Sequence, residues 1–356
     1  MPVPKFSLLT LKPLDSLFFG PNLGLELSSN AASLLFPLPW TVSGALIAHL
    51  VSKKGTLSEI LESDASLERE ERGELTKLMF YGPFLIHARC KWFPTPYDLK
   101  YEPAGSSGAL YSSQLPPIIE VVEKIPAWID EARLEKYVRG EEIEVDSGWE
   151  EPKLLEEVRL GIAVDDSTRT AMRGFLYTSR HLRMQDSAIG ILAAWKTGEP
   201  LDLSGIVRLG GEGKASIIEV EDWNPSWFED ERIERGSVVK LVLISPAIYW
   251  DSSGKTSRRP PNERLEKLPG RPEVCKSRGR ELVIGPSPVM VSGWDLARRR
   301  ARRMYAAVPA GTTIYLRLKE ETGRWELTRE FWKLSLYWER GFGSPLVARA
   351  RGDLCE

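Results

Sequence analysis

The order of the N-terminal elements constrains the fold of this chain more than any other feature of its sequence. Apolar and β-branched residues over 6–14 predict a strand that ends at a proline. After two prolines and a threonine suited to an N-cap, apolar residues recur at helical spacing, which predicts a helix over 41–52. Residues 78–92 predict a pair of strands broken at Gly82–Pro83. Strand, helix, strand, strand is the order in which a ferredoxin-like unit begins.

The rest of the 356-residue chain favours strands over helices. Periodicity predicts further strands over 161–164, 174–178, 188–195, 238–249 and 312–318. Further helices are predicted over 127–138 and 328–338. A chain of this length suits two domains of ordinary size. The sequence therefore predicts an α+β fold of two ferredoxin-like domains with antiparallel sheets, over residues 1–200 and 201–356.

Two segments interrupt this pattern. Residues 98–157 contain few long apolar runs, and we interpret them as an acidic insertion in the first domain. Residues 252–280 are rich in Pro, Arg and Gly. Because such a composition buries little apolar surface, we predict a long mobile loop there.

The formal net charge of −2 conceals an uneven distribution of charge along the chain. Residues 254–303 carry fourteen Lys or Arg against five Asp or Glu, whereas residues 139–157 carry eight acidic against two basic side chains. One basic and one acidic region favour a polyanion, such as a nucleic acid, as the partner. A solvated charge run that binds nothing is the alternative, because such runs are common.

Metal, cofactor and membrane functions find no support in the sequence. Cys90, Cys275 and Cys355 are odd in number and far apart, so we expect neither a disulfide framework nor a zinc site. The three histidines are equally scattered, and we expect no metal and no cofactor. No stretch approaches the ~20 apolar residues of a membrane span, so we expect a cytoplasmic protein without membrane contact.

Catalysis is also hard to place. A serine or cysteine nucleophile needs a base within reach, and the sequence contains no Gly-x-Ser-x-Gly elbow. His181 and Tyr177 are the candidates for metal-independent RNA cleavage, but nothing supplies a partner base. An endoribonuclease is therefore the second hypothesis, behind binding without catalysis.

The glycine-rich stretch over 208–220 resembles a phosphate-binding loop only superficially. Ala215 follows Lys214 where a P-loop requires Ser or Thr, and the residues after it favour a strand over a helix. Gly210, Gly211 and Gly213 can adopt positive φ and let an extended ligand approach the backbone, with Lys214 as a charge. A hairpin turn that needs the same angles is the more frequent use of such a motif.

Residues 165–183 interleave four arginines with hydroxyls and aromatic rings at the edge of a predicted strand. Asp165 and Asp166 begin the segment and favour a turn. Arginine offers a planar fork for phosphate and a plane for stacking, so the segment suits a single-stranded nucleic acid. A hairpin whose rings face the core and whose arginines face water fits the residues equally well.

Residues 294–304 predict a helix with arginine over most of its surface. Such density of positive charge suits an RNA backbone or an acidic protein surface. A solvated helix is the alternative.

Six motifs, in order over residues 3–350, resemble the third subunit of the Cmr effector complex, a CRISPR-associated RAMP-superfamily protein of type III-B systems. They are Leu34 to Leu46, Thr168 to Ala171 with Gly174 to Tyr177, Leu209 to Gly213, Ser292 to Leu296, Ala307 to Thr312 and Gly341 to Gly343. Two departures stand out. Trp40 stands where the family usually has serine, so we expect stacking in place of a hydrogen bond. The basic run Arg298 to Arg303 is longer than the family's.

The resemblance implies RRM-related domains with glycine-rich loops along a cleft. It also implies that the subunit caps the guide RNA at its 5′ repeat-derived tag and catalyses nothing itself. Its implied partners are the large polymerase/cyclase-like subunit and the backbone subunit of an antiviral ribonucleoprotein. RNA contacts are predicted at Asn22, Trp40, Thr41, Ser43, Arg169, Thr170, Arg173, Tyr177, Gly210, Gly211, Gly213, Lys214, Arg298, Arg299, Gly341, Phe342 and Gly343.

Overall fold

The computed structural model describes most of the chain. The described residues are 3–20, 36–54, 78–104, 107–112, 126–145, 149–196, 201–250, 254–295, 300–350 and 355. Among them, only the backbone is described for residues 54, 100–104, 107–112, 144–145, 173–177, 294–295 and 300.

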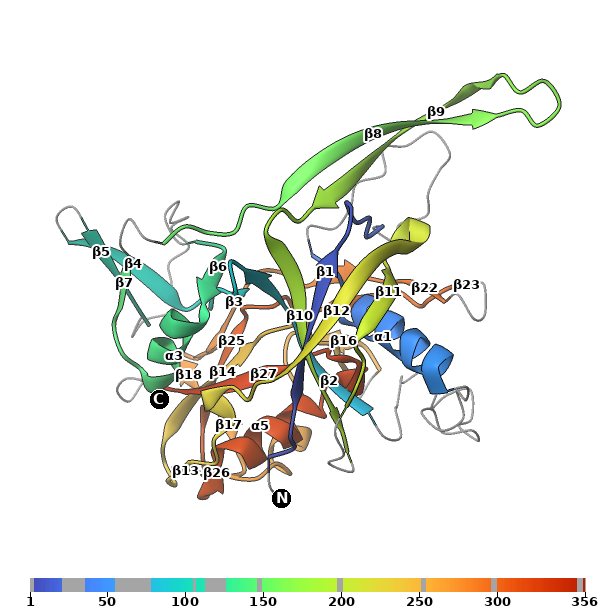
Figure 1. The fold of residues 1–356 in the computed structure, drawn as a ribbon. Helices are drawn as coiled ribbons and strands as arrows, with labels where there is room; N and C mark the ends of the chain where they lie inside the picture. The colour runs from blue at the N-terminus through green and yellow to red at the C-terminus, as the bar shows by residue number, and fades with distance from the viewer. Residues whose placement is uncertain are drawn as a thin grey trace.

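A seven-stranded sheet forms the first half of the molecule, and every neighbouring pair of its strands is antiparallel (Figure 1). In spatial order its strands are β11 (Gly205–Leu209), β12 (Lys214–Asp222), β1 (Ser7–Pro13), β10 (Ser187–Trp195), β2 (Leu78–His87), β3 (Cys90–Pro94) and β6 (Trp128–Asp130). Helix α1 (Pro39–Lys54) packs against β11 and β2, because Val42, Leu46 and Leu50 form a buried stripe along one side of it.

A second, five-stranded sheet is built from the C-terminal half. It contains β17 (Glu273–Val274), β25 (Thr313–Arg317), β14 (Val238–Leu243) and β27 (Pro345–Arg349), with β20 (Val283–Ile284) also paired to β25. Helix α5 (Arg324–Trp332) packs on β27.

The two sheets share a continuous aromatic core. Trp325 of α5 lies 6.3 Å, between ring centroids, from Phe6, which precedes β1. Trp332 of α5 lies 5.5 Å from Tyr81 of β2. The Tyr81 hydroxyl donates to the carbonyl of Pro345 at 3.1 Å. The predicted division into domains at residues 200 and 201 stays a prediction.

Smaller elements surround these sheets. A three-stranded sheet contains β4 (Leu99–Ala104), β5 (Ser107–Ser112) and β7 (Ile143–Val145), and helix α3 (Glu131–Arg139) lies beside β6. Strands β8 (Leu155–Val164) and β9 (Ala171–Arg183) form a projecting arm. The remaining short elements are β13 (Arg232–Ile233), β15 (Tyr249–Trp250), β16 (Thr256–Ser257), α4 (Asn262–Leu265), β18 (Lys276–Ser277), β19 (Arg280–Glu281), β21 (Val289–Val291), β22 (Trp294–Asp295), β23 (Arg300–Ala301), β24 (Tyr305–Ala307) and β26 (Thr322–Gly323), and the 3-10 turns η1 (Gly211–Gly213), η2 (Ser226–Phe228) and η3 (Trp338–Arg340).

A buried polar cluster, which we call the Asp98 cluster, joins the two halves. Its members are Asp98, Tyr137, Lys240, Thr313 and Tyr315. The hydroxyls of Tyr137 and Tyr315 each donate to the Asp98 carboxylate at 2.7 Å, and Thr313 donates at 3.2 Å. The Nζ of Lys240 lies 3.6 Å from the same carboxylate and 3.6 Å from the Tyr137 ring centroid. Burial and the neighbouring Asp98 charge raise the pKa of Tyr137 well above its usual value, so the phenol stays a donor.

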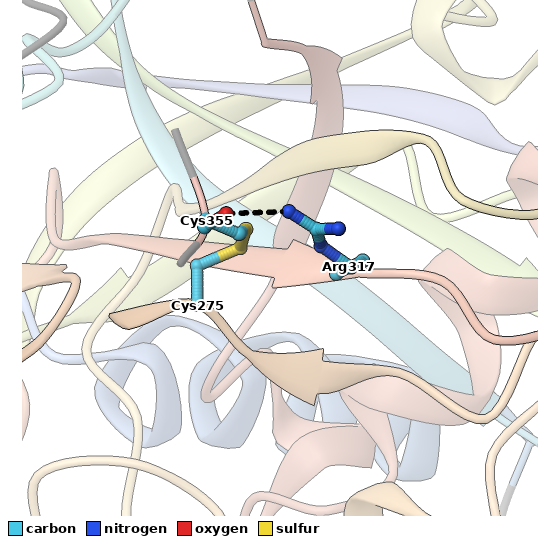
Figure 2. Close-up of a disulfide and its surroundings, with 3 residues drawn as sticks. All are labelled: Cys275, Arg317 and Cys355. Atoms are coloured by element: carbon cyan, nitrogen blue, oxygen red, sulfur yellow. Dashed lines mark hydrogen bonds between the residues drawn. A yellow bond between two sulfur atoms is a disulfide. The ribbon is translucent and has the colours of Figure 1, made fainter. Parts of the chain in front are cut away.

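The expectation of no disulfide is wrong. Cys275 and Cys355 form a disulfide with their Cα atoms 4.8 Å apart, while Cys90 is a free, exposed thiol (Figure 2). The Arg317 guanidinium donates to the Cys355 carbonyl at 2.6 Å, which helps hold Cys355 against the second sheet. The sequence did not indicate this pairing, because 80 residues separate the two cysteines and only the fold brings them together.

The α+β class and the antiparallel sheets are confirmed, as are most predicted strands. The predicted break at Gly82–Pro83 is wrong, since β2 runs through it and turns into β3 at Ala88 and Arg89. The helix predicted over 127–138 begins later, because residues 128–130 pair with β3 and Asp130 caps the helix by accepting from the Arg133 N–H at 3.0 Å.

Two helix predictions near the C-terminus also need correction. The helix predicted over 328–338 lies at 324–332; the Thr328 hydroxyl donates to the Arg324 carbonyl at 2.8 Å, so Thr328 lies inside the helix. The arginine-rich helix over 294–304 is wrong, because β22 and β23 pair as a hairpin. A helix there would set like charges three and four residues apart and would have no apolar face.

The predicted mobile loop over 252–280 is wrong for the described residues 254–280. Strand β17 joins the second sheet, and Leu265, Leu268 and Val274 are buried. The few apolar residues of this segment are each placed inward, so it packs despite its composition.

Candidate nucleic-acid interface

The arm formed by β8 and β9 projects from the body of the molecule (Figure 1). Its ladder runs from Leu155 opposite Arg183 to Val164 opposite Ala171. Along β8 the exposed residues alternate and include an apolar stripe of Val158, Leu160, Ile162 and Val164. Leu160 is 74% exposed, and a contiguous exposed apolar stripe of this kind is typical of an interaction surface.

The tip of the arm is an ordered turn that presents Arg169 and Thr170. The Asp165 carboxylate accepts from the backbone N–H groups of Ser167 and Thr168 at 2.9 and 3.0 Å. Hydrogen bonds from the Ser167 hydroxyl and these N–H groups lower the pKa of Asp165 to about 2. Arg169 adopts a left-handed φ of 54°, and both it and Thr170 are exposed.

Six charged side chains, which we call the arm-base network, gather where the arm leaves the body. They are Asp15, Glu157, Arg159, Arg183, Glu212 and Lys214. Asp15 lies 3.4 to 3.5 Å from the cationic groups of Arg159, Arg183 and Lys214. Glu157 accepts from Arg159 at 2.8 Å and from Arg183 at 2.6 Å. Each cation of the network therefore already has an acidic neighbour.

A hydrogen bond from the backbone of Ser16 lowers the pKa of Asp15 to about 2, with Lys214 and Arg159 contributing. Beside the network, Pro13, Leu14, Met184 and Gln185 join Asp15 and Arg183 in lining an open pocket of about 220 Å³. Leu14 is 59% exposed there, so the pocket combines charge with an apolar surface.

The glycine-rich stretch is a hairpin turn between β11 and β12, as the motif alone favoured. Gly210 and Gly213 have positive φ of 76° and 58°, but Gly211 does not, and Glu212 adopts φ 61° in its place. The chain itself occupies one side of the turn: Gly211 N–H donates to the Phe18 carbonyl at 2.7 Å. A Cβ on Gly210 would lie 2.7 Å from that carbonyl oxygen, so the close approach that these glycines permit is made by Phe18.

His181 lies inside the arm base. Its ring packs against Phe18 at 5.3 Å between centroids, with the two planes inclined by 40°. Its Nε2 is 3.1 Å from the Ser179 hydroxyl, and the residue is 1% exposed. Burial lowers the pKa of His181, so the ring is held neutral. A buried neutral imidazole packed on a phenyl ring is poorly placed to meet an RNA ribose.

A second cationic region lies on the segment 289–307, which we call the arginine hairpin. β21 pairs with β24 at its base and β22 pairs with β23 nearer its end. Arg303 lies over the rings of Trp250 and Tyr305, with its Cζ 5.2 and 5.8 Å from their centroids. Arg302 lies over Trp40 at 6.0 Å.

The predicted contact residues divide between these regions. Arg169, Thr170, Gly210, Gly211, Gly213 and Lys214 lie at the arm and its base, and only the backbone is described for Arg173 and Tyr177. Trp40, Gly341, Phe342 and Gly343 lie beneath the arginine hairpin, with Thr41 next to Trp40 in α1. Asn22, Arg298 and Arg299 lie outside the described residues.

Several residues predicted to contact RNA make contacts within the fold. The Ser43 hydroxyl donates to the Pro39 carbonyl at 2.9 Å and is fully buried. Trp40 packs against Phe342 and Tyr337 at 4.7 and 5.6 Å between centroids, in tilted and edge-on geometry, so its stacking on RNA stays a prediction. Sequence reasoning missed Asp15, Trp250 and Tyr305. The sequence shows the positive charge of the neighbouring residues, but it does not show which distant residues the fold brings next to them.

Within the described ranges, no three His, Cys, Asp or Glu side chains gather closely enough to hold a metal ion. No helix of the described chain has the length and apolar character needed to span a membrane.

Comparison with known proteins gives consistent matches. The model of a family described as "CRISPR-associated protein (Cas_Cmr3)" matches residues 9–349. A protein of Saccharolobus solfataricus, "CRISPR system CMR subunit Cmr3", is 24% identical over 320 residues, which cover 85% of this chain and 84% of that protein.

Solved structures are similar at lower scores. A chain in a cryo-EM structure of the type III-B Cmr-beta complex bound to cognate target RNA and AMPPnP is 21% identical with a TM-score of 0.48, covering 87% of this chain and 86% of that one. A chain of the Csm3–Csm4 subcomplex of a type III-A complex is 11% identical with a TM-score of 0.43, covering 97% and 100%.

Proposed function

Because this chain belongs to the Cmr3 family of CRISPR-associated proteins, we propose that it is an RNA-binding subunit of a type III-B effector complex. In this proposal it holds the 5′ repeat-derived tag of the guide RNA and itself catalyses no reaction. It bridges the large polymerase/cyclase-like subunit and the backbone subunit.

The observation that carries the proposal is that the base of the β8–β9 arm, the glycine turn between β11 and β12 and the pocket lined by Asp15 and Arg183 lie next to one another. The bridge between Leu17 and Leu182 and the bond from Gly211 to Phe18 fasten the arm base to the glycine turn. Arg183 and Lys214, from different strands, approach the same Asp15 carboxylate. An RNA phosphate that replaced Asp15 as their acceptor would receive two charge-assisted hydrogen bonds.

The arm supports the bridging role. Its apolar stripe is solvent-exposed over most of the length of β8, which fits a neighbouring protein subunit better than it fits water. Arg169 at the tip and Arg180, which pairs with Glu156, give the same arm a cationic contribution beside the apolar one. One element is thereby suited to contact both protein and RNA.

The endoribonuclease hypothesis receives no support from a specific observation. His181 is buried and its pKa is lowered by that burial, and the Glu212 carboxylate lies 3.8 Å from its Nε2, which is too far for a hydrogen bond. We therefore keep binding without catalysis as the proposal.

The test uses the complex assembled from this chain, its partner subunits and guide RNA. Chemical probing is expected to find the tag nucleotides protected with the chain and exposed without it. Combined replacement Arg183→Ala and Lys214→Ala is expected to expose them several-fold, because two phosphate donors are lost.

Lys5→Ala is the matched control: it removes a similar exposed cation, paired to Asp222, from the far end of β1. It is expected to leave protection unchanged. Equal exposure of the tag with and without the chain would sink the proposal. Cleavage of the guide by the chain alone in EDTA would contradict its non-catalytic part.

A further inference from the structure

The arginine hairpin carries a feature that the proposed function does not use. The Arg303 guanidinium lies over two rings, 5.2 Å from the centroid of Trp250 and 5.8 Å from that of Tyr305. The two rings are 6.2 Å apart and inclined by 37°. Arg303 is exposed, and within the described part of the chain no carboxylate pairs with it.

The aromatic base under Arg303 is held by the core. The hydroxyls of Tyr305 and Tyr337 are 3.1 Å apart, and Tyr337 packs edge-on against Trp40. Trp332 Nε1 donates to the Phe342 carbonyl at 3.0 Å, which fixes the turn that carries Phe342 under Trp40. The Tyr305 ring under the arginine is therefore anchored to the core, so binding of a stacked ligand would cost little conformational entropy of this ring.

The backbone of the hairpin is equally well fixed near the arginines. Arg302 N–H donates to the Gly293 carbonyl at 2.7 Å, and the Ser292 hydroxyl donates to the Arg302 carbonyl at 2.9 Å. Arg302 lies over Trp40, so two consecutive arginines each lie over an aromatic side chain. Met290 and Met304, 57% and 44% exposed, add apolar surface beside them.

We propose that Arg303, supported by Trp250 and Tyr305, is a stacking platform for one unpaired base of a single-stranded RNA. This inference rests on the proposed function and names a second place on the chain where RNA is held. A guanidinium lying on an aromatic ring keeps its edge N–H groups available and offers its other face for stacking. Unpaired bases stack on such planes in single-stranded complexes.

An acidic protein segment is the competing occupant of the same surface. The aromatic support favours RNA, because a carboxylate needs only the N–H edge, whereas a base also uses the plane and the exposed apolar surface around it. The two occupants make different predictions for an arginine-to-lysine change, which keeps the charge and removes the plane.

The experiment measures binding of the full-length chain to a fluorescein-labelled oligoadenylate and to a strand of the same length with abasic positions at its centre. Arg303→Lys is expected to weaken oligoadenylate binding about 5- to 20-fold, in line with one lost base stack. Binding of the abasic strand is expected to stay unchanged. The midpoint of thermal unfolding is expected to stay the same, because the side chain is exposed.

Arg232→Lys is the matched control, since Arg232 is exposed in the same half and pairs with Glu321. Equal weakening of both strands, or no weakening, would overturn the platform. Tighter binding of a polyglutamate peptide than of either strand, lost in Arg303→Ala, would identify a protein interface instead.

The outcome is separable from the test of the proposed function. If tag protection in the assembled complex depends on Arg183 and Lys214 while Arg303→Lys has no effect on oligoadenylate, the platform fails and the proposed function stands. If the chain leaves the tag exposed but the oligoadenylate result holds, the proposed function fails alone.

Discussion

The arm-base network and the arginine hairpin are both cationic, but they hold their cations differently. In the arm base, Asp15 and Glu157 lie within 3.5 Å of the cations they face. In the hairpin, Arg303 lies over the aromatic rings of Trp250 and Tyr305. A paired cation must exchange one anion for another when RNA arrives, whereas a stacked cation keeps its hydrogen-bonding edge. Ion pairing in the arm base suits a rigid arrangement of the side chains, whereas stacking in the hairpin leaves the guanidinium N–H groups able to bind a ligand.

The largest expected effect tests whether both regions stand on one scaffold. Asp98→Ala removes the carboxylate that lies 3.6 Å from the buried Lys240 ammonium, so we expect the free energy of unfolding to fall by about 3–5 kcal/mol in urea titrations. RNA binding should weaken at both regions together.

Tyr315→Phe serves as the control for this change, because it removes one hydrogen bond to Asp98 and leaves the ion pair in place. We expect a loss of about 1–2 kcal/mol. If Asp98→Ala lost no more stability than Tyr315→Phe, the two regions would not depend on the Asp98 cluster.

An intermediate effect tests whether the contact between the glycine turn and Phe18 at the arm base stabilises the fold. Gly210→Ala sets a Cβ 2.7 Å from the Phe18 carbonyl at a φ of 76°, and we expect it to destabilise the fold by about 2–3 kcal/mol. At Gly213 the nearest atom to a new Cβ is 3.5 Å away, so Gly213→Ala should lose about 1 kcal/mol. Thermal unfolding of both variants distinguishes the positions. Equal losses would show that the contact with Phe18 is unimportant.

The smallest expected effect concerns the pH dependence of the arm-base network. The pKa of Asp15 in the folded chain is about 2, below its value in the unfolded chain, so its contribution is present above about pH 4. That contribution is lost as the pH falls from about 4 toward 2. Asp15→Asn should therefore be less stable than the wild type at pH 6 and equally stable near pH 2. We expect a difference below about 1 kcal/mol at pH 6, because the side chain is 44% exposed and screened by water. A difference that persists at pH 2 would assign the effect to something other than charge.

Local patterns in the sequence predicted the strands well, because β-branched alternation and prolines act over a few residues. Strand β10 and helix α1 follow from such patterns to within a few residues. Contacts between distant segments were beyond reach. Nothing around Asp98 indicates that it meets Lys240, and nothing around Gly210 indicates that Phe18 covers it.

The functional site was foreseen in part for the same reason. The arginines of residues 165–183 and 298–303 were visible as charge, but their partners come from elsewhere in the chain. Trp250 is separated from Arg303 by more than fifty positions, so a platform of the two could not be read from composition. Repulsion within the arginine run also favoured a hairpin over the predicted helix, a choice that counts of charge alone do not make.

The disulfide between Cys275 and Cys355 has a topological consequence. It turns the chain between them into a closed covalent ring, and the arginine hairpin, β25, α5 and β27 all lie on that ring. A protease that nicked the backbone anywhere on the ring would release no fragment, because the severed ends would remain tethered through the sulfur atoms. A single backbone cleavage would therefore leave the arginine hairpin covalently attached to the rest of the chain, as long as the disulfide is intact.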